Sequence, residues 1–129
     1  MFLISAEKFS LWKKKQISKG GDNHSLNLLI DSLAGLSNEE LNLLKIRCEN
    51  NLNLKLNLDL LEFFWDKHLN TSIPIQYLSG ISYWRNLKLE VSNRVLIPRP
   101  ETELFIDVIS GIFKNKEEKI TFVDLGTGS

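Results

Sequence analysis

Apolar residues in the first third of the chain recur at the three- and four-residue spacing of amphipathic helices. Ser5 is a residue type that caps helices, and the pattern after it predicts a first helix that ends at Gly20 and Gly21. A second helix is predicted from residues 23–25 to about Gly35, with a stripe of leucines on its buried face. This part of the chain is therefore expected to be helical.

A capping box predicts the start of a third helix. The Ser37 hydroxyl and the Glu40 carboxylate can each accept a hydrogen bond from the backbone N–H of the other residue. The helix that follows would carry Leu41, Leu44 and Cys48 on one face.

Residues 50–60 alternate leucine with mostly polar residues, a pattern typical of a half-buried strand. Asparagine is unfavourable in strands, and the tract is biased in composition. We therefore interpret it as a loop that leads into another helix, with Asn57 as the cap of that helix.

Beyond Pro74 the pattern changes to that of strands. Aromatic and β-branched residues are frequent in residues 75–91, and the alternation there predicts a β-hairpin that turns near Arg85 and Asn86. Pro100 suits the first position of a helix over residues 101–113. A short apolar strand is then expected at residues 120–125.

The composition of the chain mainly argues against certain classes of protein and certain kinds of site. Hydrophobic residues make up 43% of the chain and charged residues 25%, which is typical of soluble globular proteins and argues against a membrane protein. The 16 basic and 16 acidic residues cancel, so direct nucleic-acid binding is not favoured. Cys48 is the single cysteine, and with only His24 and His68 it predicts neither a disulfide nor a metal site. A cytoplasmic location fits these features.

Several lysine and aromatic side chains can be explained by the fold alone, without a ligand. The lysines at residues 13–15 are expected to form a solvated helix end, with a binding patch as the alternative. Trp12 and residues 63–65 are expected in the core or at its rim, with a ligand cage as the alternative. Tyr83 and Trp84 are expected to pack the hairpin against a neighbouring element, with contact to a partner protein as the alternative.

The last residues contain the candidate cofactor site. Asp124 ends the predicted strand and is followed by Leu125, Gly126, Thr127 and Gly128. Glycines let a backbone approach a ligand closely, and a helix beginning after them would point N–H groups at it. This short motif alone fits S-adenosylmethionine, a dinucleotide or no ligand at all.

Three motifs in order resemble the release factor glutamine methyltransferase family. They are Pro-Ile-Gln-Tyr-Leu-Ser-Gly at 74–80, Val-Leu-Ile-Pro-Arg-Pro-Glu-Thr-Glu at 95–103, and Val-Asp-Leu-Gly-Thr-Gly-Ser at 123–129. The resemblance implies an α+β fragment with three parts. An N-terminal all-α helix bundle for substrate recognition would cover residues 1–72, a β-hairpin linker would cover 73–97, and the start of a Rossmann-like α/β methyltransferase domain would cover 98–129.

The resemblance also implies which residues contact the cofactor, S-adenosyl-L-methionine. The loop would wrap the methionine end of the cofactor, and two earlier residues would lie beside the active site. The expected cofactor-binding residues are Asp124, Gly126, Thr127, Gly128, Ser129, Arg99 and Thr102. Residues 99–103 also suit a plain helix start with a proline and acidic residues near the positive end of the helix dipole, and both interpretations can hold.

The implied reaction transfers a methyl group to the glutamine side-chain nitrogen of the Gly-Gly-Gln motif in peptide chain release factors. Such enzymes hold this amide with an Asn-Pro-Pro-Tyr loop, and none of Pro74, Pro98 and Pro100 lies in such a motif. We therefore expect no catalytic residue in these 129 residues and no activity from them alone. The alternatives are a noncatalytic protein-binding module and a related methyltransferase that acts on a ribosomal protein or a nucleic acid.

Overall fold

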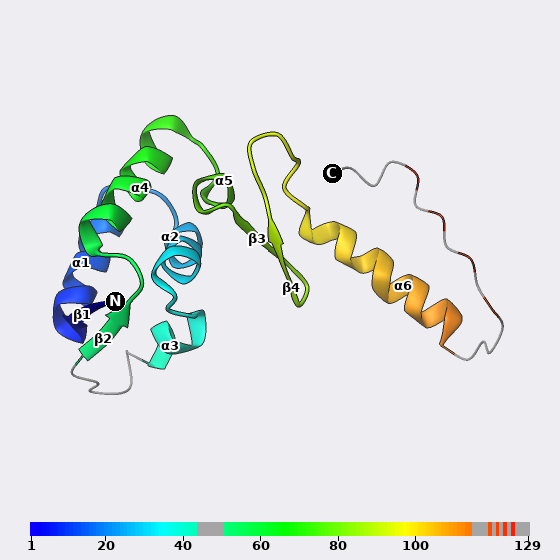
Figure 1. Ribbon diagram of the computed structural model, residues 1–129, viewed down its shortest axis with the longest axis horizontal. Helices are drawn as coiled ribbons and strands as arrows, with labels where there is room; N and C mark the ends of the chain where they lie inside the picture. Colours follow the sequence, from blue (N-terminus) through cyan, green and yellow to red (C-terminus); the bar gives the residue numbers. More distant parts are fainter. Residues whose placement is uncertain (44–50, 115–118, 120, 122, 124, 126–129) are drawn as a thin grey trace. The chain divides into compact units, whose positions relative to one another are not determined.

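The computed structural model describes the chain except for residues 44–50, 115–118, 120, 122, 124 and 126–129, and it divides into two compact units (Figure 1). One unit is Met1–Ser79 and the other is Gly80–Ser129. Leu44 and Cys48 of the predicted third helix lie outside the described residues, as do three positions of the strand predicted at 120–125. The described residues of that strand segment, Thr121, Val123 and Leu125, are in neither helix nor strand.

The first predicted helix is confirmed as α1, Ala6–Ser18. The Ser5 side chain caps it by accepting a hydrogen bond from the Lys8 backbone N–H at 3.3 Å. Phe9 and Trp12 face the core from one side of the helix. The lysines lie on its other faces.

The second predicted helix is also confirmed, although its last turn is wider than an α-helical turn. α2 is Asn23–Leu29, and it continues into the π-helical segment η1, Ile30–Ala34. The Asp22 carboxylate caps its start by accepting a hydrogen bond from the Ser25 backbone N–H at 2.9 Å. Gly35 ends it with φ at 72°, a conformation that glycine adopts without strain.

The capping box at the third helix forms as predicted. The Ser37 N–H donates to the Glu40 carboxylate at 2.8 Å, and the Glu40 N–H donates to the Ser37 hydroxyl at 3.2 Å. The described part of this helix is α3, Asn38–Leu43, and it buries Leu41.

Our loop interpretation of residues 50–60 is wrong for its first part. Asn51–Leu54 form strand β2, which pairs antiparallel with strand β1, Phe2–Ser5. The expectation that residues 1–72 are all-α is therefore also wrong, because this unit contains a two-stranded sheet.

The physical reason is the burial pattern of β2. Leu52 and Leu54 face the core, whereas Asn51 and Asn53 face solvent, so neither asparagine has to be desolvated. The strand also needs a partner for its backbone groups, and that partner is about fifty residues earlier in the chain, as in the pairing of Phe2 with Leu54. Local composition could not reveal this pairing.

The helix after β2 is capped by Asn57 as predicted, and it supplies much of the core. α4 is Leu58–Thr71, and the Asn57 side chain accepts a hydrogen bond from the Leu60 backbone N–H at 2.9 Å. A short helix, α5, follows at Ile75–Ser79, where strand-like residues were noted in the sequence. The most deeply buried side chains of the unit are Phe9, Gln16, Leu26, Leu29, Ile30, Leu54, Leu61, Trp65 and Ile75.

Ion pairs join α1 to α4 at the surface. Lys15 and Lys19 both contact Glu62, at 3.1 and 2.7 Å, and Lys19 also contacts Asp66 at 2.7 Å. Partial burial opposes the charge of Lys19, but hydrogen bonds to Asp66 and Glu62 outweigh it and raise the Lys19 pKa.

In the second unit the predicted hairpin and helix are confirmed. Strands β3, Ile81–Trp84, and β4, Leu87–Glu90, pair antiparallel around a turn at Arg85 and Asn86. A 3₁₀ turn, η2, at Pro100–Thr102 leads into α6, Glu103–Phe113.

The alternating burial along β2 predicts how two neighbouring substitutions affect stability. Leu54→Ala should lower the free energy of unfolding by about 2–5 kcal/mol, because Leu54 is only 1% exposed and its loss would leave a cavity. Asn53→Ala, next to it on the solvent face, should change stability by about 0.5 kcal/mol or less. Urea unfolding followed by circular dichroism measures both; equal effects would contradict the alternating burial.

The α1–α4 ion pairs predict a pH dependence of stability. Hydrogen bonds from Lys19 and Lys15 lower the pKa of Glu62 from 4.5 to about 2. Because the folded pKa is lowered, the stabilisation is present above the unfolded pKa of 4.5 and is lost as pH falls towards about 2. Glu62→Gln should destabilise the chain by about 0.5–1 kcal/mol at neutral pH and should flatten this acid dependence. Glu39→Gln is the control, and it should keep the slope.

Candidate functional site

Two of the seven predicted cofactor-binding residues, Arg99 and Thr102, lie in the described part of the chain. Asp124, Gly126, Thr127, Gly128 and Ser129 lie outside the described residues. The part of the candidate site that the structure describes lies at the start of α6.

Two prolines set the backbone at this point. Arg99 is extended, with φ at −87° and ψ at 136°, as expected for a residue that precedes a proline. Pro100 then occupies the first position of η2. The Thr102 hydroxyl donates a hydrogen bond to the Arg99 carbonyl at 2.6 Å, which closes the turn between the extended segment and the helix.

The hairpin holds this turn in place through Trp84. The Trp84 indole N–H donates to the Thr102 hydroxyl oxygen at 3.0 Å. The Thr102 hydroxyl therefore donates its single proton to the Arg99 carbonyl and accepts the Trp84 indole N–H with one lone pair. The structure gives Thr102 the role of joining the hairpin to the helix start.

Arg85, in the hairpin turn, makes a second set of contacts to the same helix. Its backbone N–H donates to the Glu103 carboxylate at 3.0 Å, and its guanidinium donates to the Glu103 carbonyl at 3.0 Å. The guanidinium also pairs with Asp107 at 2.8 Å. Arg85 adopts φ of 51°, a left-handed conformation that places these donors towards the helix but is costly for a residue with a side chain.

Sequence reasoning missed Arg85, Glu103 and Asp107 as members of this cluster. A signal was present, because Glu103 and Asp107 are four residues apart and so share one face of a helix, opposite in charge to an arginine in a turn. The sequence did not show that the turn lies against that face. Trp84 was expected to pack the hairpin against a neighbour, and its hydrogen bond to Thr102 is such a contact.

The Arg99 side chain is exposed, and within the described ranges its guanidinium has no recorded ion pair. A guanidinium matches the geometry of a carboxylate and can bind it through two hydrogen bonds. Arg99 therefore offers a cation beside a helix start that is hydrogen-bonded to the hairpin.

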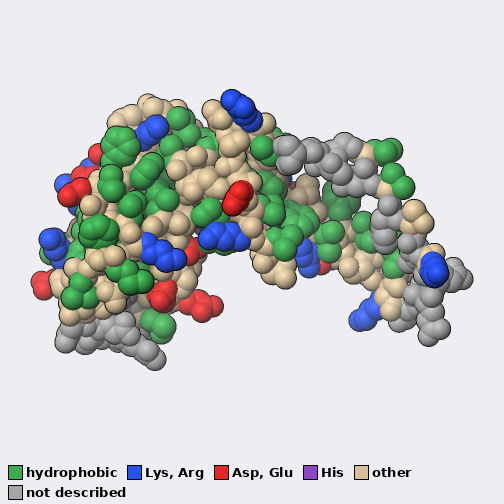
Figure 2. Space-filling view, viewed as in Figure 1, with side chains coloured by type: hydrophobic (Ala, Val, Ile, Leu, Met, Phe, Trp, Pro, Cys, Tyr) green, Lys and Arg blue, Asp and Glu red, His purple; other side chains and the backbone are tan. Residues whose placement is uncertain are grey.

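The remaining faces of α6 are strongly apolar. Leu104, Phe105, Val108 and Ile112 are 58–67% exposed, and α6 buries no side chain against any described residue. Figure 2 shows the molecular surface with apolar side chains in green.

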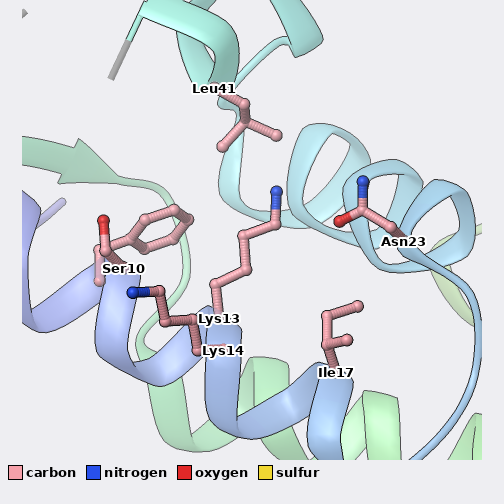
Figure 3. A pocket seen from close by; sticks show the side chains of 7 residues that line it. Ser10, Lys13, Lys14, Ile17, Asn23 and Leu41 are labelled. Atoms are coloured by element: carbon pink, nitrogen blue, oxygen red, sulfur yellow. The ribbon is translucent and has the colours of Figure 1, made fainter. Parts of the chain in front are cut away.

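A separate hollow of about 360 Å³ lies in the unit of residues 1–79 (Figure 3). Phe9, Ile17 and Leu41 give it apolar walls, and Lys13 and Lys14 come from α1 beside them. Its other lining residues are Ser10 and Asn23. The Lys13 ammonium donates to the Asn27 side chain at 2.6 Å, which fixes one cation near the hollow.

The charge of α1 is unusual for this neutral chain. The helix carries four lysines and one glutamate, a net charge of +3, counted as four minus one. Lys13 and Lys14 line this hollow, whereas Lys15 pairs with Glu62 of α4, so the expected solvated helix end places two cations beside the hollow. Cations at a surface attract acidic partners.

The described residues contain no group of three histidine, cysteine, aspartate or glutamate side chains that could hold a metal ion. No helix in the described ranges is long and apolar enough to cross a membrane.

The described chain consists of a mainly helical unit, followed by a hairpin and an amphipathic helix. Its sequence is similar to those of curated release factor glutamine methyltransferases. The relative from Prochlorococcus marinus is 39% identical over 131 residues, which cover 98% of this chain and 43% of the relative. The relative from Synechocystis sp. is 31% identical over 98% of this chain and 44% of its own length. The relative from Thermosynechococcus vestitus is 36% identical over 81% of this chain and 35% of its own length.

The chain is thus related to the release factor glutamine methyltransferases, which confirms the family that its three motifs predicted. It spans less than half the length of these curated relatives. No family model matches the chain, and no solved structure matches it.

The contacts of Arg85 predict a measurable loss of order. Arg85→Ala removes the guanidinium contacts to the Glu103 carbonyl and to Asp107 but keeps the backbone N–H bond to the Glu103 carboxylate, so backbone amides at the start of α6 should exchange with solvent about two- to tenfold faster. Arg94→Ala, an exposed arginine in the next loop, is the matched control and should leave exchange unchanged. Amide exchange measured by NMR tests this prediction. Equal rates in the Arg85 variant and the parent chain would show that the contacts of the Arg85 side chain do not form in solution.

Proposed function

We propose that the chain is the N-terminal part of a protein-glutamine N5-methyltransferase that uses S-adenosyl-L-methionine in the cytoplasm. The substrate would be the glutamine of the Gly-Gly-Gln motif in peptide chain release factors. The observation that carries the proposal is the match to named relatives over nearly the whole chain. The fixed helix start at Arg99 and Thr102 supports it, because a cofactor site needs a preorganised edge.

The chemistry explains why preorganisation is needed. The cofactor would supply a methyl group on a positively charged sulfur, which is a strong electrophile. An amide nitrogen is a poor nucleophile because its lone pair is delocalised into the carbonyl group. The protein must therefore hold the donor and acceptor in line and keep both from rotating.

The described residues fit one end of such a cofactor. The methionine end carries a carboxylate, and the exposed Arg99 guanidinium is suited to bind it. Thr102 has its proton engaged with the Arg99 carbonyl, so we assign it to positioning the Arg99 backbone. Asp124, Gly126, Thr127, Gly128 and Ser129 remain our proposed binding loop for the same cofactor.

The helical unit would recognise the release factor. Its helix α1 carries a net charge of +3 and places Lys13 and Lys14 beside the apolar hollow at Phe9 and Leu41. Charged side chains steer an encounter and apolar hollows hold the complex, as in other protein interfaces. We propose residues 1–72 for this role, 73–97 as the hairpin linker and 98–129 as the start of a Rossmann-like methyltransferase domain.

The proposal predicts an activity for the product of the full reading frame. That frame should be sequenced past Ser129, and its product should transfer a radiolabelled methyl group from S-adenosylmethionine to a purified release factor. Mass spectrometry should place the methyl group on the Gly-Gly-Gln glutamine. Arg99→Ala should weaken cofactor binding about tenfold or more, whereas Arg94→Ala, an exposed arginine outside the site, should not.

Other outcomes would separate the alternatives. Methylation of a ribosomal protein or a nucleic acid, with none of the release factor, would refute the proposed substrate. Binding of the release factor by the product without any methyl transfer would favour the noncatalytic module.

A further inference from the structure

Two consecutive hydrogen bonds connect the hairpin to the backbone of Arg99, within the second unit. The Trp84 indole N–H donates to the Thr102 hydroxyl oxygen at 3.0 Å, and the Thr102 hydroxyl donates to the Arg99 carbonyl at 2.6 Å. Trp84 precedes Thr102 by eighteen residues, so only the folded chain makes this connection. The turn at Arg99 is therefore tied to strand β3.

The indole decides where the proton of the Thr102 hydroxyl points. A hydroxyl has one proton and two lone pairs, and it rotates to donate to whichever acceptor is within reach. An indole N–H can only donate, so a hydroxyl that accepts from it must direct its own proton elsewhere. In this structure the proton goes to the Arg99 carbonyl. Trp84 thus favours the hydroxyl orientation that closes the turn.

This connection is separate from the contacts that attach α6 to the hairpin. Arg85 donates to Glu103 through its backbone N–H and its guanidinium, and it pairs with Asp107. Loss of the indole N–H alone would leave these contacts in place. The helix should then stay beside the hairpin, and only the turn at Arg99 should become less ordered.

We propose that Trp84 is a positioning residue for cofactor binding, which acts through the Thr102 hydroxyl on the turn that carries Arg99. A guanidinium binds a carboxylate through two hydrogen bonds only when the two planar groups are aligned. A backbone that is ordered before the ligand arrives loses less conformational freedom on binding. The inference rests on the proposed function, in which Arg99 binds the carboxylate of S-adenosylmethionine, and it names the hairpin residue that sets the affinity for that group.

Two simpler roles of the indole lead to different expectations. If its hydrogen bond only stabilised the fold, its loss would weaken the binding of every ligand at this site alike. If Thr102 bonded the cofactor directly, the effect of Trp84 would not depend on the Arg99 side chain. Ligands with and without a carboxylate, together with combined substitutions, separate these roles from the proposed one.

The first experiment compares two ligands on the product of the full reading frame. S-adenosylhomocysteine carries the carboxylate of the cofactor, whereas methylthioadenosine lacks the whole amino-acid part. Trp84→Phe keeps an aromatic ring and removes the N–H group. Isothermal titration calorimetry should show binding of S-adenosylhomocysteine about three- to tenfold weaker in this variant, with binding of methylthioadenosine unchanged.

Combined variants test the order of the contacts. Thr102→Val removes the hydroxyl at similar size, and the double variant with Trp84→Phe should bind S-adenosylhomocysteine no more weakly than Thr102→Val alone. In an Arg99→Ala background, Trp84→Phe should change the affinity by less than about twofold. Thr102→Ser keeps the hydroxyl and should bind normally. Lys88→Ala, an exposed substitution on the other face of the hairpin, is the control and should also bind normally.

Kinetics distinguish positioning from a role in the methyl transfer itself. In Trp84→Phe the KM for S-adenosylmethionine should rise by about three- to tenfold. Both kcat and the KM for the release factor should stay within about twofold of the parent values. A fall in kcat with an unchanged KM for the cofactor would overturn the positioning role.

The binding results can overturn the inference in three ways. Equal weakening of both ligands would make Trp84 a purely structural residue, and so would additive losses in the double variant. A full effect of Trp84→Phe in the Arg99→Ala background would show that it does not act on Arg99. Unchanged binding of S-adenosylhomocysteine by Trp84→Phe, with methyl transfer intact, would refute the positioning role and leave the proposed function standing.

Circular dichroism checks that each variant is folded. If Trp84→Phe does not fold, Thr102→Val makes the same comparison between the two ligands, because Thr102 is exposed and its substitution leaves no cavity. A parent product that neither binds S-adenosylhomocysteine nor transfers methyl groups would refute the proposed function, and this inference with it.

Discussion

The packing of Trp65 holds the first unit together. Its indole is fully buried, and its N–H donates to the Gln16 carbonyl at the end of α1 at 3.1 Å. Gly21 lies so close that an added Cβ would be 2.7 Å from the ring. Trp65 of α4 therefore contacts both the last turn of α1, at Gln16, and the segment that follows the helix, at Gly21. With α1 held from this side, Lys13 and Lys14 lie at the hollow beside Phe9 and Leu41.

In the second unit a few polar contacts have a comparable role. Trp84 of the hairpin donates a hydrogen bond to Thr102 at the start of α6. Arg85, in the hairpin turn, donates hydrogen bonds to Glu103. These contacts are exposed and individually weak, so the order they produce depends on several acting together. The hairpin thus sets the position of Arg99, the residue that we propose for the cofactor carboxylate.

The two units differ in the side chains that they expose. The first has lysines beside an apolar hollow, and the second has a helix start that is joined to the hairpin by hydrogen bonds. The second unit also exposes the apolar faces of α6, and the chain spans 43% of the length of the relative from Prochlorococcus marinus.

Local signals in the sequence determined the helix starts and the hairpin turn. Ser5, the Ser37 and Glu40 pair, and Asn57 could be predicted as caps because each of their hydrogen bonds spans only three residues along the chain. The three motifs likewise identified the family, since they are strings of adjacent residues.

Only the tertiary structure decided features that join distant residues. The pairing of β1 with β2 links residues about fifty apart, and it turned a tract with poor strand composition into a strand with its asparagines in solvent. The role of Thr102 was also invisible in its own motif, because its partner Trp84 is eighteen residues earlier. A sequence pattern records what each residue prefers, whereas the choice of partner depends on which distant surfaces the folded chain brings together.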